Sequence, residues 1–149
     1  RVGSKPKKLV SAKELVNLYI DICDQILVDN NLNQNNKYLF FSSLEQSIDQ
    51  FAINLHTELN LNISNFHDLN YYSKWKLLSN EAALANIIKR EMGDDGFLSD
   101  ILIAKDKLLI PIDTSIIASN DPINLKKLNS ILDKYKSFIL LLRKTLEEC

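Results

Sequence analysis

The sequence predicts an all-α fold, a bundle of five or six helices that ends in one long C-terminal helix. Apolar residues recur every three or four positions over most of the 149 residues, which is typical of the buried faces of helices. The chain has only three glycines and three prolines, too few for a turn-rich all-β protein. Its length suits one domain whose core needs no disulfide or metal.

Residues 1–10 are predicted to form a flexible basic tail ahead of a single helical domain at 11–149. The tail contains one arginine and three lysines but no acidic residue. Lys5–Lys8 resembles a minimal nuclear-import cluster, but we interpret it as a lysine-rich, solvated terminus. Because the chain begins at Arg1 and not at methionine, we expect it to be a piece of a longer protein.

The first helix is predicted to begin at Ser11, which has capping-box spacing with Glu14, and to end near Asp29. Asp21 and Asp24 fall with Glu14 on one side of it. This acidic ridge is either a solvated face or a surface for a basic partner. The opposite, buried face is predicted to consist of Leu15, Leu18, Tyr19, Ile22 and Ile26, widened by Val16, Cys23 and Leu27.

Two further helices follow an asparagine-rich loop at 30–36. One is predicted from Lys37 or Ser42 to Asn60, with Phe41, Leu44, Ile48, Phe51, Leu55 and Leu59 at helical spacing. The other is predicted from Asn80, as a cap, to Met92. Between them, the aromatic-rich segment 66–79 predicts a short helix whose rings either fill the core or stack on a ligand.

The segment 97–112 has two interpretations. Its apolar residues form a partial helical stripe interrupted by Lys105. Residues 101–104 and 107–110 also read as two short strands around a charged turn, which predicts a small β-hairpin near 101–112. Pro111 ends either element.

The last helix is predicted from Asp121, as its cap, to Glu148, with Pro122 in its first turn. Phe138–Leu142 is five apolar residues in a row, so Leu140 and Leu141 point away from the main stripe. Either other helices wrap this level, or it binds a partner. The stripe itself comprises Leu125, Leu128, Leu132, Tyr135, Ile139, Leu142 and Leu146.

The sequence contains no motif that indicates catalysis, a cofactor or a metal. Its three glycines form no phosphate-binding loop. Cys23, His56 and His67 could meet at a zinc ion in the folded chain, but their spacing in the sequence supports no such site. We therefore predict that the chain is not an enzyme. A buried Cys23 without a disulfide framework predicts a reducing compartment, cytoplasmic or nuclear, and no apolar run is long enough for a membrane span.

The charge distribution disfavours nucleic acid. Residues 11–120 contain eight basic and fifteen acidic side chains, a net charge of −7, whereas nucleic-acid affinity depends on neutralised phosphates. The predicted function is protein–protein interaction, as a scaffold or adaptor module of a larger intracellular protein. The partner is another protein, a peptide or helix, or a second copy. Candidate partner-binding residues are Leu140, Leu141, Glu14, Asp21 and Asp24.

Two alternatives from other classes remain. A winged-helix-like nucleic-acid-binding module would place Lys105 and Lys107 on the hairpin, beside a basic face that includes Lys74 and Lys76. The other alternative is an enzyme with an unrecognised site.

Overall fold

The computed structural model describes residues 10–29, 32–109 and 123–148, and these ranges contain helices and no strand. The predicted all-helical bundle is therefore confirmed. The predicted basic tail lies outside the described residues apart from its last position. In order, the elements are α1 (Ala12–Val28), α2 (Gln34–Glu58), the 3-10 helix η1 (Phe66–Asp68), α3 (Tyr71–Leu78), α4 (Ala85–Met92), α5 (Phe97–Leu109) and α6 (Leu125–Glu147).

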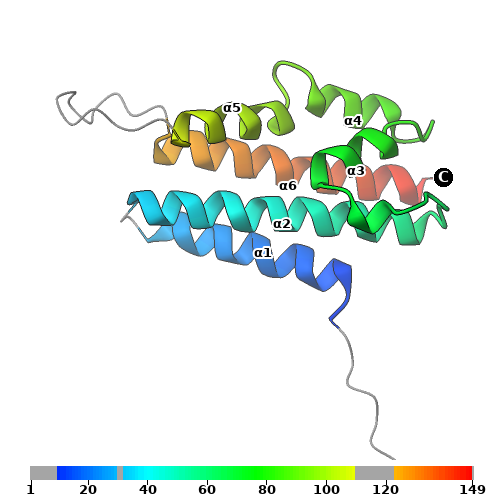
Figure 1. Cartoon of the computed structure of the whole chain (residues 1–149), viewed down its shortest axis with the longest axis horizontal. Helices are drawn as coiled ribbons and strands as arrows, with labels where there is room; N and C mark the ends of the chain where they lie inside the picture. The colour runs from blue at the N-terminus through cyan, green and yellow to red at the C-terminus, as the bar shows by residue number, and fades with distance from the viewer. Residues whose placement is uncertain (1–9, 30–31, 110–122, 149) are drawn as a thin grey trace, which may run out of the picture.

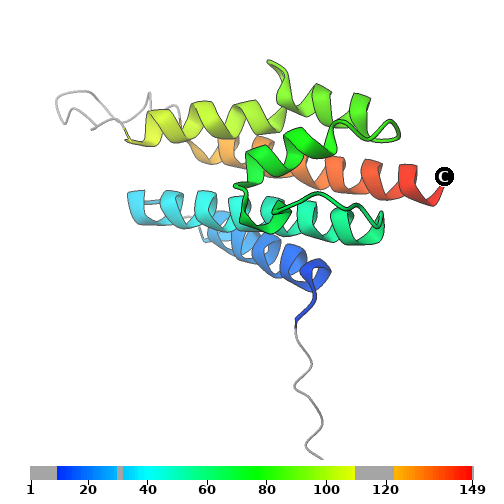
Figure 2. The ribbon, with the colours of Figure 1, turned by 45° about the vertical axis from the view of Figure 1, so that its right-hand side comes forward.

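The long helices lie side by side, with α1 at one edge of the bundle and α4 and α5 at the other (Figure 1). α2 and α6 run between these edges, and the short α3 crosses beside them, as the turned view in Figure 2 also shows. α1 packs chiefly against α2 and contacts α6 more lightly, whereas α5 packs against both α4 and α6. Because α1 lies at the edge of the bundle, the other described helices leave part of its surface uncovered.

A cluster of aromatic rings forms the centre of the core. Trp75 of α3 lies 5.4 Å from Phe51 of α2 and 5.2 Å from Phe138 of α6, measured between ring centroids. Phe97 of α5 lies 5.0 Å from Phe138. The indole N–H of Trp75 donates to the carbonyl of Ile48 at 3.0 Å, so the buried polar end of this ring is satisfied. Four helices thus meet at one cluster.

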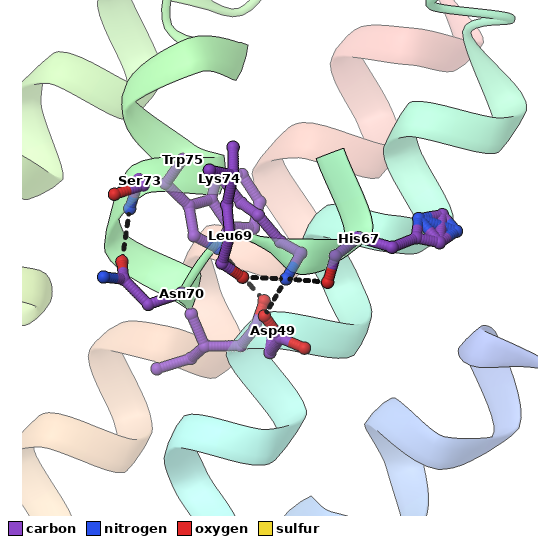
Figure 3. A network of polar contacts seen from close by, with 8 residues as sticks. Asp49, His67, Leu69, Asn70, Ser73, Lys74 and Trp75 are labelled. Atoms are coloured by element: carbon purple, nitrogen blue, oxygen red, sulfur yellow. Dashed lines mark hydrogen bonds and ion pairs between the residues drawn. The ribbon is translucent and has the colours of Figure 1, made fainter. Parts of the chain in front are cut away.

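The segment that precedes α3 is attached to α2 by a buried lysine (Figure 3). Lys74 is 2% exposed, and its ammonium donates to the Asp49 carboxylate at 2.7 Å, to the carbonyl of His67 at 3.3 Å and to the carbonyl of Leu69. A lysine ammonium has three donors, and all three have acceptors here. This explains how a charged side chain remains in the interior.

The cap predicted for the first helix is confirmed: the Ser11 hydroxyl accepts the Glu14 N–H at 3.1 Å. The prediction for the second helix placed its start too late, at Lys37 or Ser42. α2 begins at Gln34 because the Asn33 side chain accepts a backbone N–H of the first turn at 2.8 Å.

The later helices also differ from prediction in their bounds. α6 begins at Leu125, with the Asn124 side chain as its cap; the predicted start at Asp121–Pro122 lies outside the described residues. α4 begins at Ala85 and not at Asn80, because residues 79–84 form turns after α3. Residues 97–109 are helical, so the hairpin is not formed there, and its last positions lie outside the described residues. In the part of the chain described, no helix has the length and apolar character needed to cross a membrane.

We predict that Asp49→Asn lowers the free energy of unfolding by about 3 kcal/mol, since it leaves the buried Lys74 ammonium without its counter-charge. The matched control is Glu45→Gln. Its partner Lys105 is 40% exposed, so the loss should stay below about 1 kcal/mol. Urea unfolding measures both variants, and equal losses would contradict a structural role for the Lys74–Asp49 pair.

Candidate interaction surface

The rotation of α1 about its own axis is fixed by its contacts with α2. Val16, Cys23 and Leu27 are buried in this contact. The Ser47 hydroxyl donates to the carbonyl of Val16 at 2.9 Å, and the Cys23 thiol donates to the carbonyl of Phe40 at 3.5 Å. Both bonds reach the backbone of the opposite helix, so they hold the two helices close together.

This rotation corrects the buried face predicted for the first helix. Leu18 is 51% exposed and Ile22 is 37% exposed, although both were predicted to be buried. The small side chains of Ser47 and Cys23 let α1 approach α2 along the neighbouring strip, so Leu18 and Ile22 are turned outward, while Ile26 still packs against the core. We call that strip, which consists of Leu15, Leu18, Tyr19, Ile22 and Ile26, the outer α1 face; its other three members are half-buried.

The outer α1 face points away from α6. Lys136 of α6 pairs with Asp24 at 2.7 Å. Successive residues of a helix are rotated by roughly 100° about its axis. Measured from Val16 about the α1 axis, Asp24 lies about 80° in one direction, and the centre of the outer α1 face lies about 100° in the opposite direction. α6 therefore covers one flank of α1, and the apolar strip lies on the opposite flank.

Two acidic residues border this strip. Glu14 precedes Leu18 by one helical turn and Asp21 follows it by three residues, so both lie along the Leu18 edge of the outer α1 face. Both are exposed, and we call them the acidic rim. The third residue of the predicted acidic ridge, Asp24, is instead paired with Lys136.

The two leucines singled out on the last helix are in different environments. Leu140 is 70% exposed, while Leu141 is half-buried. Other described helices therefore do not wrap α6 at this level. Leu140 follows Lys136 by one turn and so lies on the side of α6 that reaches toward Asp24. The structure does not join Leu140 to the outer α1 face, because the two lie on opposite flanks of α1.

An open cleft of about 600 Å³ lies between α2, the start of α3, and α5. Its charged groups are already paired: Lys74 with Asp49, and Lys105 with Glu45 at 3.0 Å. Burial and the neighbouring Glu45 carboxylate raise the pKa of the Tyr71 hydroxyl, which makes no hydrogen bond of ordinary geometry. The tyrosine therefore stays neutral. The two lysines and the two carboxylates of the ion pairs balance, so these four side chains give the cleft no net charge.

The lysines required by the winged-helix alternative do not form one basic face. Lys74 is buried and Lys105 is engaged by Glu45. Lys76 and Lys107 are exposed. The helical conformation of 101–109 also provides no strand pair on which Lys105 and Lys107 could form a wing.

The histidines have structural contacts. His56 stacks on Phe66 at 4.3 Å, and its Nε2 accepts the Ile63 N–H at 3.4 Å. The ring of His67 lies 6.0 Å from that of His56, but Cys23 is bonded to α2 four turns away, near its start. Within the described ranges, no three His, Cys, Asp or Glu side chains gather as a metal site.

Comparison of the chain with family models, curated proteins and solved structures finds no match. The sequence predicted Glu14 and Asp21 on an exposed side of the first helix, and both are exposed there, but it assigned Leu18 and Ile22 to the core. The available signal was that apolar residues occupy more than half of the circumference of α1, which is more than one packed face requires.

We predict that Leu140→Asp leaves the fold intact, with a change in the free energy of unfolding of no more than about 0.5 kcal/mol, because the side chain is exposed. Leu142→Asp is the matched control, since Leu142 is fully buried and should not tolerate a charge. Circular dichroism melts of the two variants decide. Unfolding of the Leu140→Asp variant would contradict the prediction, because it would show that the Leu140 side chain is buried in the folded chain.

We predict that Cys23 resists alkylation in the folded chain. Burial, followed by the charge of Asp24, raises the pKa of its thiol to about 12, so little thiolate exists at neutral pH. A Cys149→Ser background isolates Cys23, and denaturant should restore the iodoacetamide rate of an ordinary cysteine. The unfolded chain loses this proton near the ordinary thiol pKa of 9.0, and the folded chain loses it only near a pKa of about 12. This thiol therefore reduces stability as the pH rises through that interval. Rapid labelling of the native chain would contradict the buried placement.

Proposed function

We propose that this chain is a protein–protein interaction module, a scaffold or adaptor part of a larger intracellular protein, and that the outer α1 face is its contact surface. The observation that carries the proposal is that Leu18 and Ile22, two apolar side chains of this strip, are exposed. Fully burying a large aliphatic side chain contributes about 1.5–3 kcal/mol. Leu18 and Ile22 are already partly covered, so a partner that covers the strip gains a part of this amount from each of them.

The continuity of the strip distinguishes it from the other exposed apolar residues. Isolated apolar side chains are ordinary on protein surfaces, and those of the other helices occur singly or as adjacent pairs. On α1, Leu18 and Ile22 are exposed one turn apart on the same face, and with its half-buried members the outer α1 face extends about 17 Å along the helix at 1.5 Å per residue. This length is sufficient for about three turns of a partner helix.

The proposal is tested by photo-crosslinking. A photoreactive amino acid at position 18 or 22 should give a discrete crosslinked product in the cells that make the protein. The same group at the exposed Lys126 of α6, as the control, should not. Sizing of the product separates a second copy from a different protein.

We predict that the double variant Leu18→Ser, Ile22→Ser stays folded, because both side chains are exposed, and loses this crosslinked partner. Its melting temperature, measured alongside, establishes that the fold is intact. Capture of the same partner by the folded double variant, or equal crosslinking from position 126, would contradict the proposal.

A further inference from the structure

We infer that the outer α1 face binds an amphipathic helix of a different protein whose apolar stripe is bordered by lysine or arginine. The inference rests on the proposed function and adds the chemistry of the partner to it. Three features of the surface lead to it: the secondary structure that presents it, the charges beside it, and the positions of the lysines on α1 and α2.

The first feature is that a helix presents the surface. The backbone groups of α1 are bonded within the helix, so the strip offers no row of N–H and C=O groups with which an extended strand could pair. Its side chains recur at positions 15, 18, 19, 22 and 26. That spacing matches the contact stripe of a second helix laid along it, in the helix-in-groove manner of recognition.

The second feature is the acidic rim. Glu14 and Asp21 are seven residues apart, two helical turns along the same edge, and both are exposed. Asp24 differs because Lys136 already pairs with it. Basic side chains two turns apart on a partner helix would meet both carboxylates of the rim, and charges at the edge of an interface mainly set its specificity and association rate.

The third feature argues against a second copy as the occupant. α1 contains one lysine, Lys13, which lies on the flank near Asp24 and away from the strip. α2 also contains one lysine, Lys37, which is buried. Two outer α1 faces laid together, parallel or antiparallel, would thus bring no basic side chain from α1 or α2 to Glu14 and Asp21. The same charges disfavour an anionic membrane surface.

The experiment uses two synthetic helical peptides with the same leucine stripe, one flanked by lysines and one by glutamates. Fluorescence anisotropy measures the binding of each to the full chain. The lysine peptide should bind about tenfold more tightly or better, and its advantage should shrink when NaCl rises from ~0.05 M to ~0.5 M, because salt screens exposed charges.

Variants of the chain assign the effect to the surface. Glu14→Lys with Asp21→Lys should reverse the preference between the two peptides. The matched control, Asp94→Lys with Asp95→Lys, makes the same change of charge in the exposed turn between α4 and α5 and should leave the preference unchanged. Leu18→Ser with Ile22→Ser should abolish the binding of both peptides.

Each contrary outcome has a distinct meaning. If both peptides bind equally and the Glu14 and Asp21 variant has no effect, the basic flank is wrong. The proposed function stands as long as the serine variant still abolishes binding. If the serine variant binds the lysine peptide as well as the natural chain does, the attraction is charge alone and the inference is overturned. If neither peptide binds, the inference is also overturned, and crosslinking from position 18 or 22 then decides the proposed function separately.

Discussion

The hydroxyl of Ser47 sits where three helices meet, and the placement of α1 depends on it. It donates to the carbonyl of Val16 at 2.9 Å and lies 2.8 Å from the hydroxyl of Tyr135, with all three groups in the buried interior. A buried hydroxyl without a partner costs about 1–3 kcal/mol, so α1, α2 and α6 must keep their register. A larger side chain at position 47 would separate α1 from α2.

This constraint decides which apolar residues of α1 are buried. With Val16 held against α2, the neighbouring strip that contains Leu18 and Ile22 cannot face the core. The other described helices have their own centre in the aromatic cluster around Phe138, and the segment before α3 is closed onto α2 by Lys74. The surplus apolar surface therefore lies on the edge helix, where a partner can reach it.

Much of the architecture could be predicted from local signals. Helical spacing gave the fold class, and the relation of Ser11 to Glu14 located the start of the first helix correctly. Asn33 as the cap of α2 was missed because it lies in an asparagine-rich stretch typical of a loop. The burial of Lys74 has no sequence signal, because its counter-charge lies on another helix, 25 residues earlier in the chain.

The candidate site shows a different limit. Periodicity identifies the apolar positions of α1, but these cover more than half of its circumference and do not indicate which part packs. That choice depends on contacts with Ser47 and Phe40, which only the assembled fold brings together. Leu140 is the contrasting case. It lies off the main stripe of its helix, which already suggested exposure as one of two outcomes, and it is exposed.

The orientation of α1 is tested most directly by methyl NMR of the full chain with a soluble paramagnetic agent, which broadens the signals of solvent-accessible methyl groups. We predict strong broadening for Leu18 and Ile22, and none for Val16 and Leu27. Protection of Leu18 and Ile22 together with broadening of Val16 would contradict this orientation, because α1 would then bury the strip on which the proposed interaction surface depends.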